Sequence, residues 1–161
     1  MGKETLIDEI RTKLGEAVEG VSESFGDPVL TVRPGSLLSI MVALRAAPFD
    51  YAVLLDLTGV DFTAGEGRFE LVYHLYSLSR NVRLRLKTSL PTADPVADSI
   101  TGLWKNADWL EREVFDMFGV LFTGHPDLRR LLTYEGFEGH PLRKAYPWRL
   151  AQPRIPMKDK V

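Results

Sequence analysis

The sequence predicts an α+β fold with an N-terminal helix, a small, mainly antiparallel sheet packed with helices, and an extended, irregular C-terminal tail. Apolar residues recur at helical spacing in residues 4–19 and 109–118. Three strand-like runs lie between them, joined by loops too short for a crossover. Beyond residue 128 the chain is rich in Pro, Gly, Arg and aromatics. We therefore expect a compact α+β domain over residues 1–128 and a basic, Pro-rich, partner-binding tail over 129–161.

Composition excludes several classes of protein. A chain of 161 residues has the length of one domain, and it can bury roughly 70% of its unfolded surface without a metal or disulfide. It contains no cysteine, which excludes a disulfide framework, a thiolate zinc site and cysteine-ligated iron–sulfur clusters. No apolar run approaches the ~20 residues of a spanning helix. We expect contact with a membrane only indirectly, through a partner.

Charge is unevenly distributed along the chain. Residues 129–161 hold eight basic and three acidic residues, whereas residues 1–128 hold 12 basic and 19 acidic ones. Such a contrast between a basic tail and an acidic body suggests an interaction role for the tail. The tail lacks a nucleic-acid-binding motif and the body is acidic, so we expect no nucleic-acid partner.

The first half of the chain predicts a helix, a strand and a second helix. Residues 4–19 form an amphipathic helical pattern that ends near Gly20. Residues 29–33 read as a short strand. Pro34 then opens a helix that stops before Pro48. The apolar stripe of the first helix comprises Ile7, Ile10, Leu14, Ala17 and Val21.

Three consecutive strands follow, over residues 52–62, 68–78 and 82–89, and their short loops predict an antiparallel meander. The third strand alternates cleanly, so one face should meet the core. The other should be solvated or dock onto an acidic neighbour. The apolar positions are Val82, Leu84 and Leu86, and the basic positions are Arg83, Arg85 and Lys87.

The region after the meander predicts two further helices. Asp94 followed by Pro95 has the pattern of a helix start. Asp108 with Glu111 resembles a capping box for the helix over residues 109–118, which ends at Gly119.

The helix over residues 109–118 is apolar nearly all round, which predicts burial, yet it carries four charged residues. Buried charges require partners. Arg112 and Asp116 are one turn apart and are expected to pair. Glu111 and Glu113 point to different faces, and we expect the Arg-rich tail to supply a partner.

Two Gly-His-Pro triplets, at residues 124–126 and 139–141, raise the alternative of a free-standing metal-dependent enzyme. His125 and His140 lack the spacing of a known metal motif, so loop-fixing is the better interpretation. Glu111 and Glu113 do not converge as a paired acid/base site. Nucleotide-binding and acyl-transfer motifs are absent from the sequence.

The stretches EREVFDMFGV, GHPDLRRLL and EGHPLRKAYP closely resemble the signature of the respiratory-chain NADH dehydrogenase (complex I) 30 kDa subunit family, whose bacterial members are the C subunits of NADH–quinone oxidoreductases. The likeness is specific over residues 104–147. The signature residues, which we expect to form a partner interface, are Glu111, Arg112, Glu113, Asp116, Gly119, His125, Pro126, Asp127, Arg129, Arg130, His140, Pro141, Arg143, Lys144 and Tyr146.

The resemblance implies a non-catalytic structural or assembly subunit in the peripheral arm of a proton-translocating complex. FMN, iron–sulfur clusters and quinone would lie on partner subunits, and this chain would hold no catalytic residue, cofactor or metal. Its main partner would be the quinone-site (49 kDa-type) subunit, at the cytoplasmic face of the bacterial cell membrane. Phe137, Tyr146 and Trp148 are candidate anchors in the tail. The equivalent subunit of a related membrane-bound hydrogenase or formate-oxidising complex is an alternative.

Overall fold

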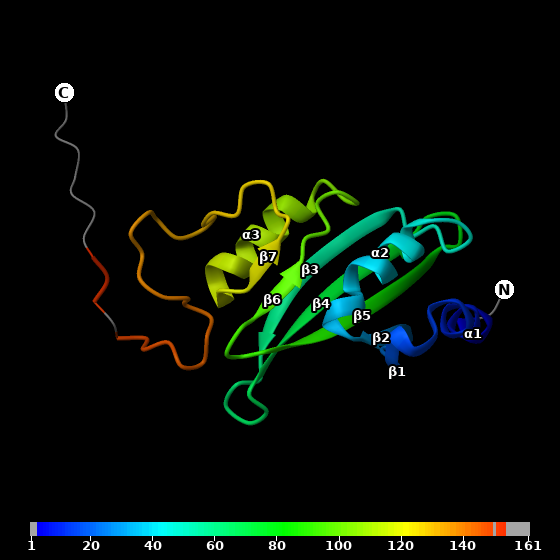
Figure 1. The fold of residues 1–161 in the computed structure, drawn as a ribbon, viewed down its shortest axis with the longest axis horizontal. Helices are drawn as coiled ribbons and strands as arrows, with labels where there is room; N and C mark the ends of the chain where they lie inside the picture. The colour runs from blue at the N-terminus through cyan, green and yellow to red at the C-terminus, as the bar shows by residue number, and fades with distance from the viewer. Residues whose placement is uncertain (1–2, 150, 154–161) are drawn as a thin grey trace.

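The computed structural model describes residues 3–149 and 151–153, so the predicted tail beyond 153 lies outside the described residues (Figure 1). Helix α1 (Lys3–Leu14) and a 3-10 turn (Gly15–Ala17) begin the chain. Ile10 is fully buried, as the apolar stripe of the first helix predicts.

The predicted first helix is too long, because Val18–Ser24 forms strand β1 rather than further helical turns. β1 pairs antiparallel with β2 (Asp27–Val32), the strand predicted at residues 29–33. Phe25 and Gly26 connect them, with φ values of 52° and 80°. Two consecutive positive φ angles are what a type I′ hairpin turn requires, so the turn and the pairing override the helical pattern at Val18 and Val21.

Helix α2 (Leu37–Arg45) follows a 3-10 turn (Pro34–Ser36), which confirms the predicted second helix. Pro34 occupies the first turn, where a missing N–H does no harm. Four side chains of α2 are buried against the sheet, namely Leu37, Ile40, Met41 and Leu44.

The predicted meander is confirmed by strands β3 (Val53–Asp61), β4 (Arg68–Ser77) and β5 (Val82–Pro91). Each pairs antiparallel with the next. β5 also pairs with β2, in parallel, so the five-stranded sheet has the order β1-β2-β5-β4-β3.

The helix predicted at Asp94-Pro95 does not form, because Val96–Asp98 is strand β6. β6 pairs in parallel with β7 (Leu121–Thr123), and helix α3 (Ala107–Phe118) connects the two. Leu121 N–H donates to Pro95 O at 2.9 Å, and Asp94 O accepts from Val96 N–H. The bond from Leu121 and the pairing of β6 with β7 are non-local, and they override the local cap-and-proline signal.

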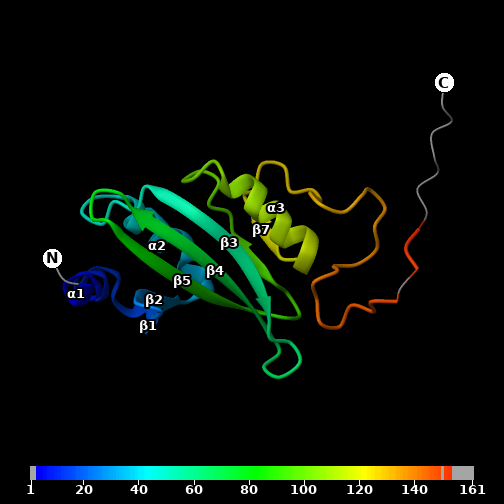
Figure 2. The same cartoon turned by 180° about the vertical axis from the view of Figure 1, so that it is seen from behind.

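The sheet has one covered face and one open face. Figure 1 shows α2 lying over the strands, and in Figure 2, seen from behind, β3, β4 and β5 are nearest the viewer with α2 beyond them. The covered face carries the core, including the fully buried Tyr73, Leu75 and Leu86. Phe118 brings α3 into the same core, edge-on to Phe69.

Among the described residues, no helix has both the length and the apolarity to cross a bilayer.

Candidate functional site

The signature residues gather around α3 and around the irregular chain at residues 124–146, which we call the anchored segment. α3 ends at Gly119, as predicted, but its N-cap is Asn106 rather than Asp108. The predicted capping box is wrong, because no side chain caps the helix start. Glu111 points elsewhere, and its Oε1 accepts a hydrogen bond from the Ile100 N–H at 2.7 Å.

Glu111 is a fully buried carboxyl group at the N-terminal half of α3. Its Oε2 has no hydrogen-bond partner among the described residues, and His125 Nε2 lies 4.0 Å from it. Burial raises the pKa of Glu111, although the Ile100 N–H partly offsets the effect. The Arg-rich tail, which the sequence led us to expect, does not supply its partner in the part of the chain that the structure describes.

His125 holds the loop after β7 against α3. Its Nδ1 accepts a hydrogen bond from the Asp127 N–H at 3.0 Å, so Nε2 carries the ring proton. Nε2 can then donate to Asp108 O, 3.2 Å away. This is the loop-fixing role expected of a Gly-His-Pro turn, which Pro126 completes.

Arg112 is buried and binds the main chain of the anchored segment. Its Nε and Nη2 donate to the carbonyl oxygens of Arg129 and Arg130, both at 3.2 Å. The guanidinium also lies over the Trp109 ring, 5.2 Å from its centroid. The expected pair with Asp116 does not form, because each residue finds its partner in residues 129–133 instead.

Asp116 lies at the centre of the hydrogen-bond network that joins α3 to the anchored segment. Its Oδ1 accepts from the Arg130 guanidinium at 2.8 Å and from the Thr133 hydroxyl. Its Oδ2 accepts from three consecutive backbone N–H groups, those of Leu131, Leu132 and Thr133, at 3.0, 2.8 and 2.8 Å. Burial opposes ionisation, but the hydrogen bonds from Thr133 and Arg130 outweigh it and hold the pKa of Asp116 well below its usual range.

The C-terminal end of α3 is capped by the second Gly-His-Pro region. His140 Nδ1 lies 2.9 Å from Asp116 O, and Arg143 Nε donates to Phe118 O at 2.5 Å. Gly119 has a φ of 72°, and a Cβ there would lie 2.5 Å from atoms of both His140 and Arg143. Glycine is therefore required at this position for backbone conformation and for space.

The last part of the anchored segment contacts the body of the protein and itself. Lys144 N–H donates to Asp61 Oδ2 at 2.7 Å, at the end of β3. The Tyr146 ring stacks on Phe137, with centroids 6.2 Å apart. Arg130 also contacts this stack, because its guanidinium lies 5.8 Å from the Phe137 centroid.

The side chains of some signature residues lie outside this network. Glu113 is exposed on α3. Arg129 and Asp127 pair with each other at 2.8 Å on the surface, where such pairs contribute little. Pro141 is half-buried in the turn between His140 and Leu142.

His125 and His140 do not converge on a shared site. His125 binds Asp108 O and His140 binds Asp116 O, two atoms eight residues apart on α3, or about 12 Å along its axis. Within residues 3–149 and 151–153, no three His, Cys, Asp or Glu side chains are grouped as a metal site. This geometry gives no support to the alternative of a metal-dependent enzyme that uses both histidines.

Two participants were missed from the sequence. Thr133 contributes both its hydroxyl and its N–H to Asp116. Asp61 binds Thr63 N–H as well as Lys144 N–H, both at 2.7 Å. An Asp two residues before a Thr, at the end of a strand, is an Asx-turn signal that reveals Asp61 in part. Nothing local to Thr133 indicates its distant partner.

The comparison with known families decides the identity. The profile of the respiratory-chain NADH dehydrogenase 30 kDa subunit matches residues 30–152, which include all of the signature and most of the sheet. The chain belongs to this family.

A family member from Azorhizobium caulinodans, the C subunit of an NADH-quinone oxidoreductase, is 46% identical over 125 residues. That alignment covers 77% of this chain and 59% of the relative, so the chain spans little more than half of that relative's length.

Two solved structures resemble the fold. A trypsin-resistant fragment of Nqo5 matches 78% of this chain and 98% of its own, with a TM-score of 0.68 and 30% identity. A chain of the membrane-bound sulfane sulfur reductase, an archaeal respiratory membrane complex, matches 98% of both chains with a TM-score of 0.74. At 22% identity, the second likeness concerns the fold alone.

Proposed function

We propose that the chain is a non-catalytic structural and assembly subunit in the peripheral arm of a proton-translocating NADH–quinone oxidoreductase, at the cytoplasmic face of the bacterial membrane. FMN, iron–sulfur clusters and quinone would be held by other subunits. The observation that carries the proposal is that the buried charges of α3 bind the protein's own main chain.

Three charged groups of the signature already have internal partners. Arg112 and Arg143 donate to carbonyl oxygens, and Asp116 accepts from three backbone N–H groups. A charged side chain whose hydrogen bonds are made to the protein's own main chain is not available to bind a substrate. Such charge-assisted hydrogen bonds are strong, so they fix the path of the main chain. This supports a positional rather than a catalytic role for the signature.

The anchored segment and the residues after it present apolar side chains to solvent. Leu132, Leu142 and Trp148 are 63%, 54% and 80% exposed. The Arg149 guanidinium lies over the Trp148 ring, 4.3 Å from its centroid. Trp and Arg dominate the energetics of protein interfaces, so this surface suits a partner subunit. The resemblance to the family points to the quinone-site (49 kDa-type) subunit as that partner.

The test must separate docking from folding. The division between a domain over residues 1–128 and a tail over 129–161 stays a prediction, and residues 140–146 contact α3 and β3. Deletion from Pro147 onward is therefore the cleaner cut. Among the described residues it removes only contacts with the anchored segment, such as those from Gln152 to Glu138 and Tyr146.

We expect the truncated, affinity-tagged chain to melt like the full chain but not to be recovered with other subunits from solubilised membranes. Quinone reductase activity should fall because the complex is absent. Mass spectrometry of the chains that co-purify with the full-length protein identifies the complex. Normal assembly of the truncated chain would contradict the docking role, and co-purification with hydrogenase-type subunits would favour the alternative complex.

Single substitutions provide a matched comparison. Trp148→Ala should reduce recovery in the complex without changing the melting temperature. Phe25→Ala is the control, because Phe25 is 100% exposed in the β1–β2 turn and makes no part of the proposed interface. Equal recovery of the two variants would exclude Trp148 as an anchor.

A further inference from the structure

The sheet carries a second surface that the signature does not involve. Its uncovered side, which we call the open sheet face, comprises Val72, His74 and Tyr76 of β4 and Arg83, Arg85 and Lys87 of β5. These residues face one another across the strands, with Tyr76 opposite Arg83, His74 opposite Arg85 and Val72 opposite Lys87. Figure 2 shows these strands toward the viewer, and no helix of the described residues lies over them.

The cations of this face differ in whether they are already paired. Lys87 Nζ lies 2.8 Å from Glu70, which also binds Arg68 at 3.1 Å. Arg83 and Arg85, in contrast, have no ion pair and no side-chain hydrogen bond within the described part of the chain. Arg85 Nε is buried without a partner. A charged donor that is shielded from water is stabilised by an acceptor, so Arg85 would gain from one supplied by a partner.

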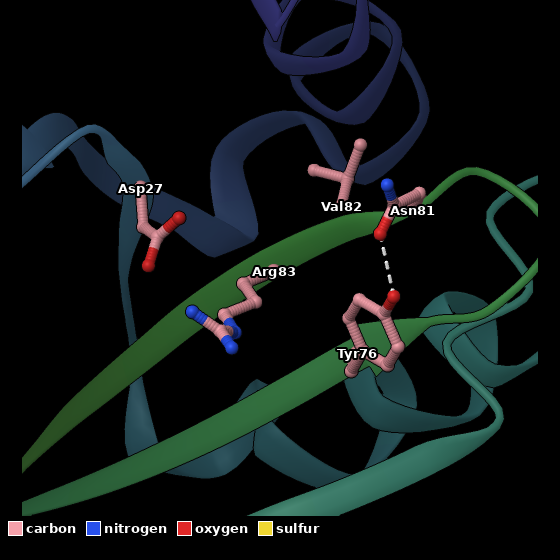
Figure 3. A pocket seen from close by; sticks show the side chains of 5 residues that line it. All are labelled: Asp27, Tyr76, Asn81, Val82 and Arg83. Atoms are coloured by element: carbon pink, nitrogen blue, oxygen red, sulfur yellow. Dashed lines mark hydrogen bonds between the residues drawn. The ribbon is translucent and has the colours of Figure 1, made fainter.

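A polar pocket lies beside Arg83. It has a volume of about 280 Å³ and is lined by Asp27, Tyr76, Asn81, Val82 and Arg83. Figure 3 shows the Arg83 guanidinium reaching between Asp27 and Tyr76, while the Tyr76 hydroxyl donates to Asn81 Oδ1 at 2.6 Å. The pocket therefore offers a free guanidinium beside an ordered polar wall.

We propose that the open sheet face docks an acidic segment of a neighbouring subunit, whose Asp or Glu carboxylates pair with Arg83 and Arg85. The two side chains leave the same side of one strand about 7 Å apart, a spacing that an extended acidic segment can match. A carboxylate binds a guanidinium through two parallel hydrogen bonds and would satisfy the shielded Arg85. The proposal rests on the proposed function only in requiring a neighbouring subunit.

The distribution of acidic groups argues for a protein partner. Asp27 lines the same pocket as Arg83, and Asp56 lies opposite His74 on β3. A uniform polyanion, such as a nucleic acid or an anionic lipid surface, would be repelled by these carboxylates. A protein segment can place its own acidic residues at the arginines and donors at Asp27.

The first experiment maps the contact without altering either arginine. Tyr76 is replaced by the photo-crosslinking residue benzoylphenylalanine in the affinity-tagged full chain, and the assembled complex is illuminated and digested. We expect a crosslink to an Asp- or Glu-containing peptide of another subunit. The control position is Val42, which is 49% exposed on α2, on the opposite side of the molecule. A crosslink at Tyr76 to lipid, to this chain alone or to a peptide without acidic residues overturns the proposal. A crosslink yield at Tyr76 no higher than that at Val42 overturns it as well.

The second experiment tests the charges. The double variant Arg83→Glu/Arg85→Glu should lower recovery in the complex at least about tenfold, because reversed charges repel the acidic segment. Lys105→Glu is the matched control, since Lys105 is exposed in the loop before α3. If the charge-reversed variant does not fold, the neutral double variant Arg83→Gln/Arg85→Gln provides the test. Its recovery in the complex should fall while its melting temperature stays the same as that of the wild type. Normal assembly of the folded variants would overturn the proposal that the open sheet face docks an acidic segment. Normal assembly of the chain truncated at Pro147 would instead contradict the docking role of the tail in the proposed function.

Discussion

At the scale of single residues, Asp116 shows how one side chain organises a loop. Its carboxylate accepts five hydrogen bonds, all from residues 130–133. A buried carboxylate that accepts several N–H groups stays ionised, and it replaces the hydrogen bonds that a strand or helix would have given those residues.

Asp116→Asn should therefore destabilise the chain by about 3–5 kcal/mol. The substitution removes the negative charge that balances Arg130, and it replaces one of the two carboxylate oxygens that accept hydrogen bonds from residues 130–133. Urea unfolding at pH 7 measures the change. Glu113→Gln, on the exposed side of the same helix, should change stability by less than about 0.5 kcal/mol. Because the pKa of Asp116 is lowered on folding, its contribution is present above the usual carboxyl pKa of about 4 and is lost at lower pH. The difference in unfolding free energy between wild type and Asp116→Asn should thus become smaller in acid. A difference that stays constant with pH would contradict this account.

Glu111 should show the opposite dependence on pH. Burial raises its pKa, so folding favours the protonated group, and its contribution is complete below about pH 4.3 and lost as pH rises through the folded value. Gln resembles the protonated acid but does not titrate. Glu111→Gln should therefore gain stability relative to wild type when denaturation is repeated from pH 5 to pH 8. A relative loss over that range would show that the carboxylate is stabilised in the fold.

At the scale of elements, α3 is the helix on which the core and the anchored segment both depend. Phe118 is 8% exposed and lies against Gly59 and the Phe69 ring. Phe118→Ala should lower the free energy of unfolding by about 3–5 kcal/mol and reduce the soluble yield. Trp109→Ala on the same helix removes a side chain that is 60% exposed and should cost far less. Similar melting temperatures for the two variants would place α3 outside the core.

Local patterns predicted the elements whose stability is local. The meander, α2 and α3 follow from alternation, helical periodicity and the Gly119 stop, and the structure confirms them. The first two residues of β1 and the whole of β6 were assigned to helix, because their partners are what make them strands. Val96 is paired with Leu121, and the hairpin turn at Phe25 fixes β1. β6 has only three residues, too few to show the alternation of a strand. The helix start predicted from Asp94 and Pro95 therefore had no opposing local pattern.

The candidate site was predicted in part for a similar reason. The apolar surroundings of α3 correctly indicated that Arg112 and Asp116 are buried. Most of their partners were not predictable, since they are main-chain atoms of an irregular segment more than ten residues away. Every residue has the same backbone C=O group and all but proline the same N–H, so the sequence holds no local mark of which ones a buried charge will bind.

At the scale of the whole molecule, the described residues include no group of three His, Cys, Asp or Glu side chains that could hold a metal ion. We expect no metal or flavin at one per chain in purified protein, and no change in melting temperature on addition of EDTA. Elemental analysis and a melting curve measure this. One zinc or iron per chain, or a large loss of stability with the chelator, would revive the metal-dependent alternative.

The way Asp116 holds residues 131–133 bears on how this region tolerates substitution. Its Oδ2 binds amide N–H groups, which every amino acid except proline provides. The side chain of Leu132 is therefore free to vary in size and charge while the loop keeps its course, whereas proline at 132 would remove a hydrogen bond. Position 132 can thus diverge between relatives that bind different partners, and it is a suitable place for a fluorescent label that reports on assembly.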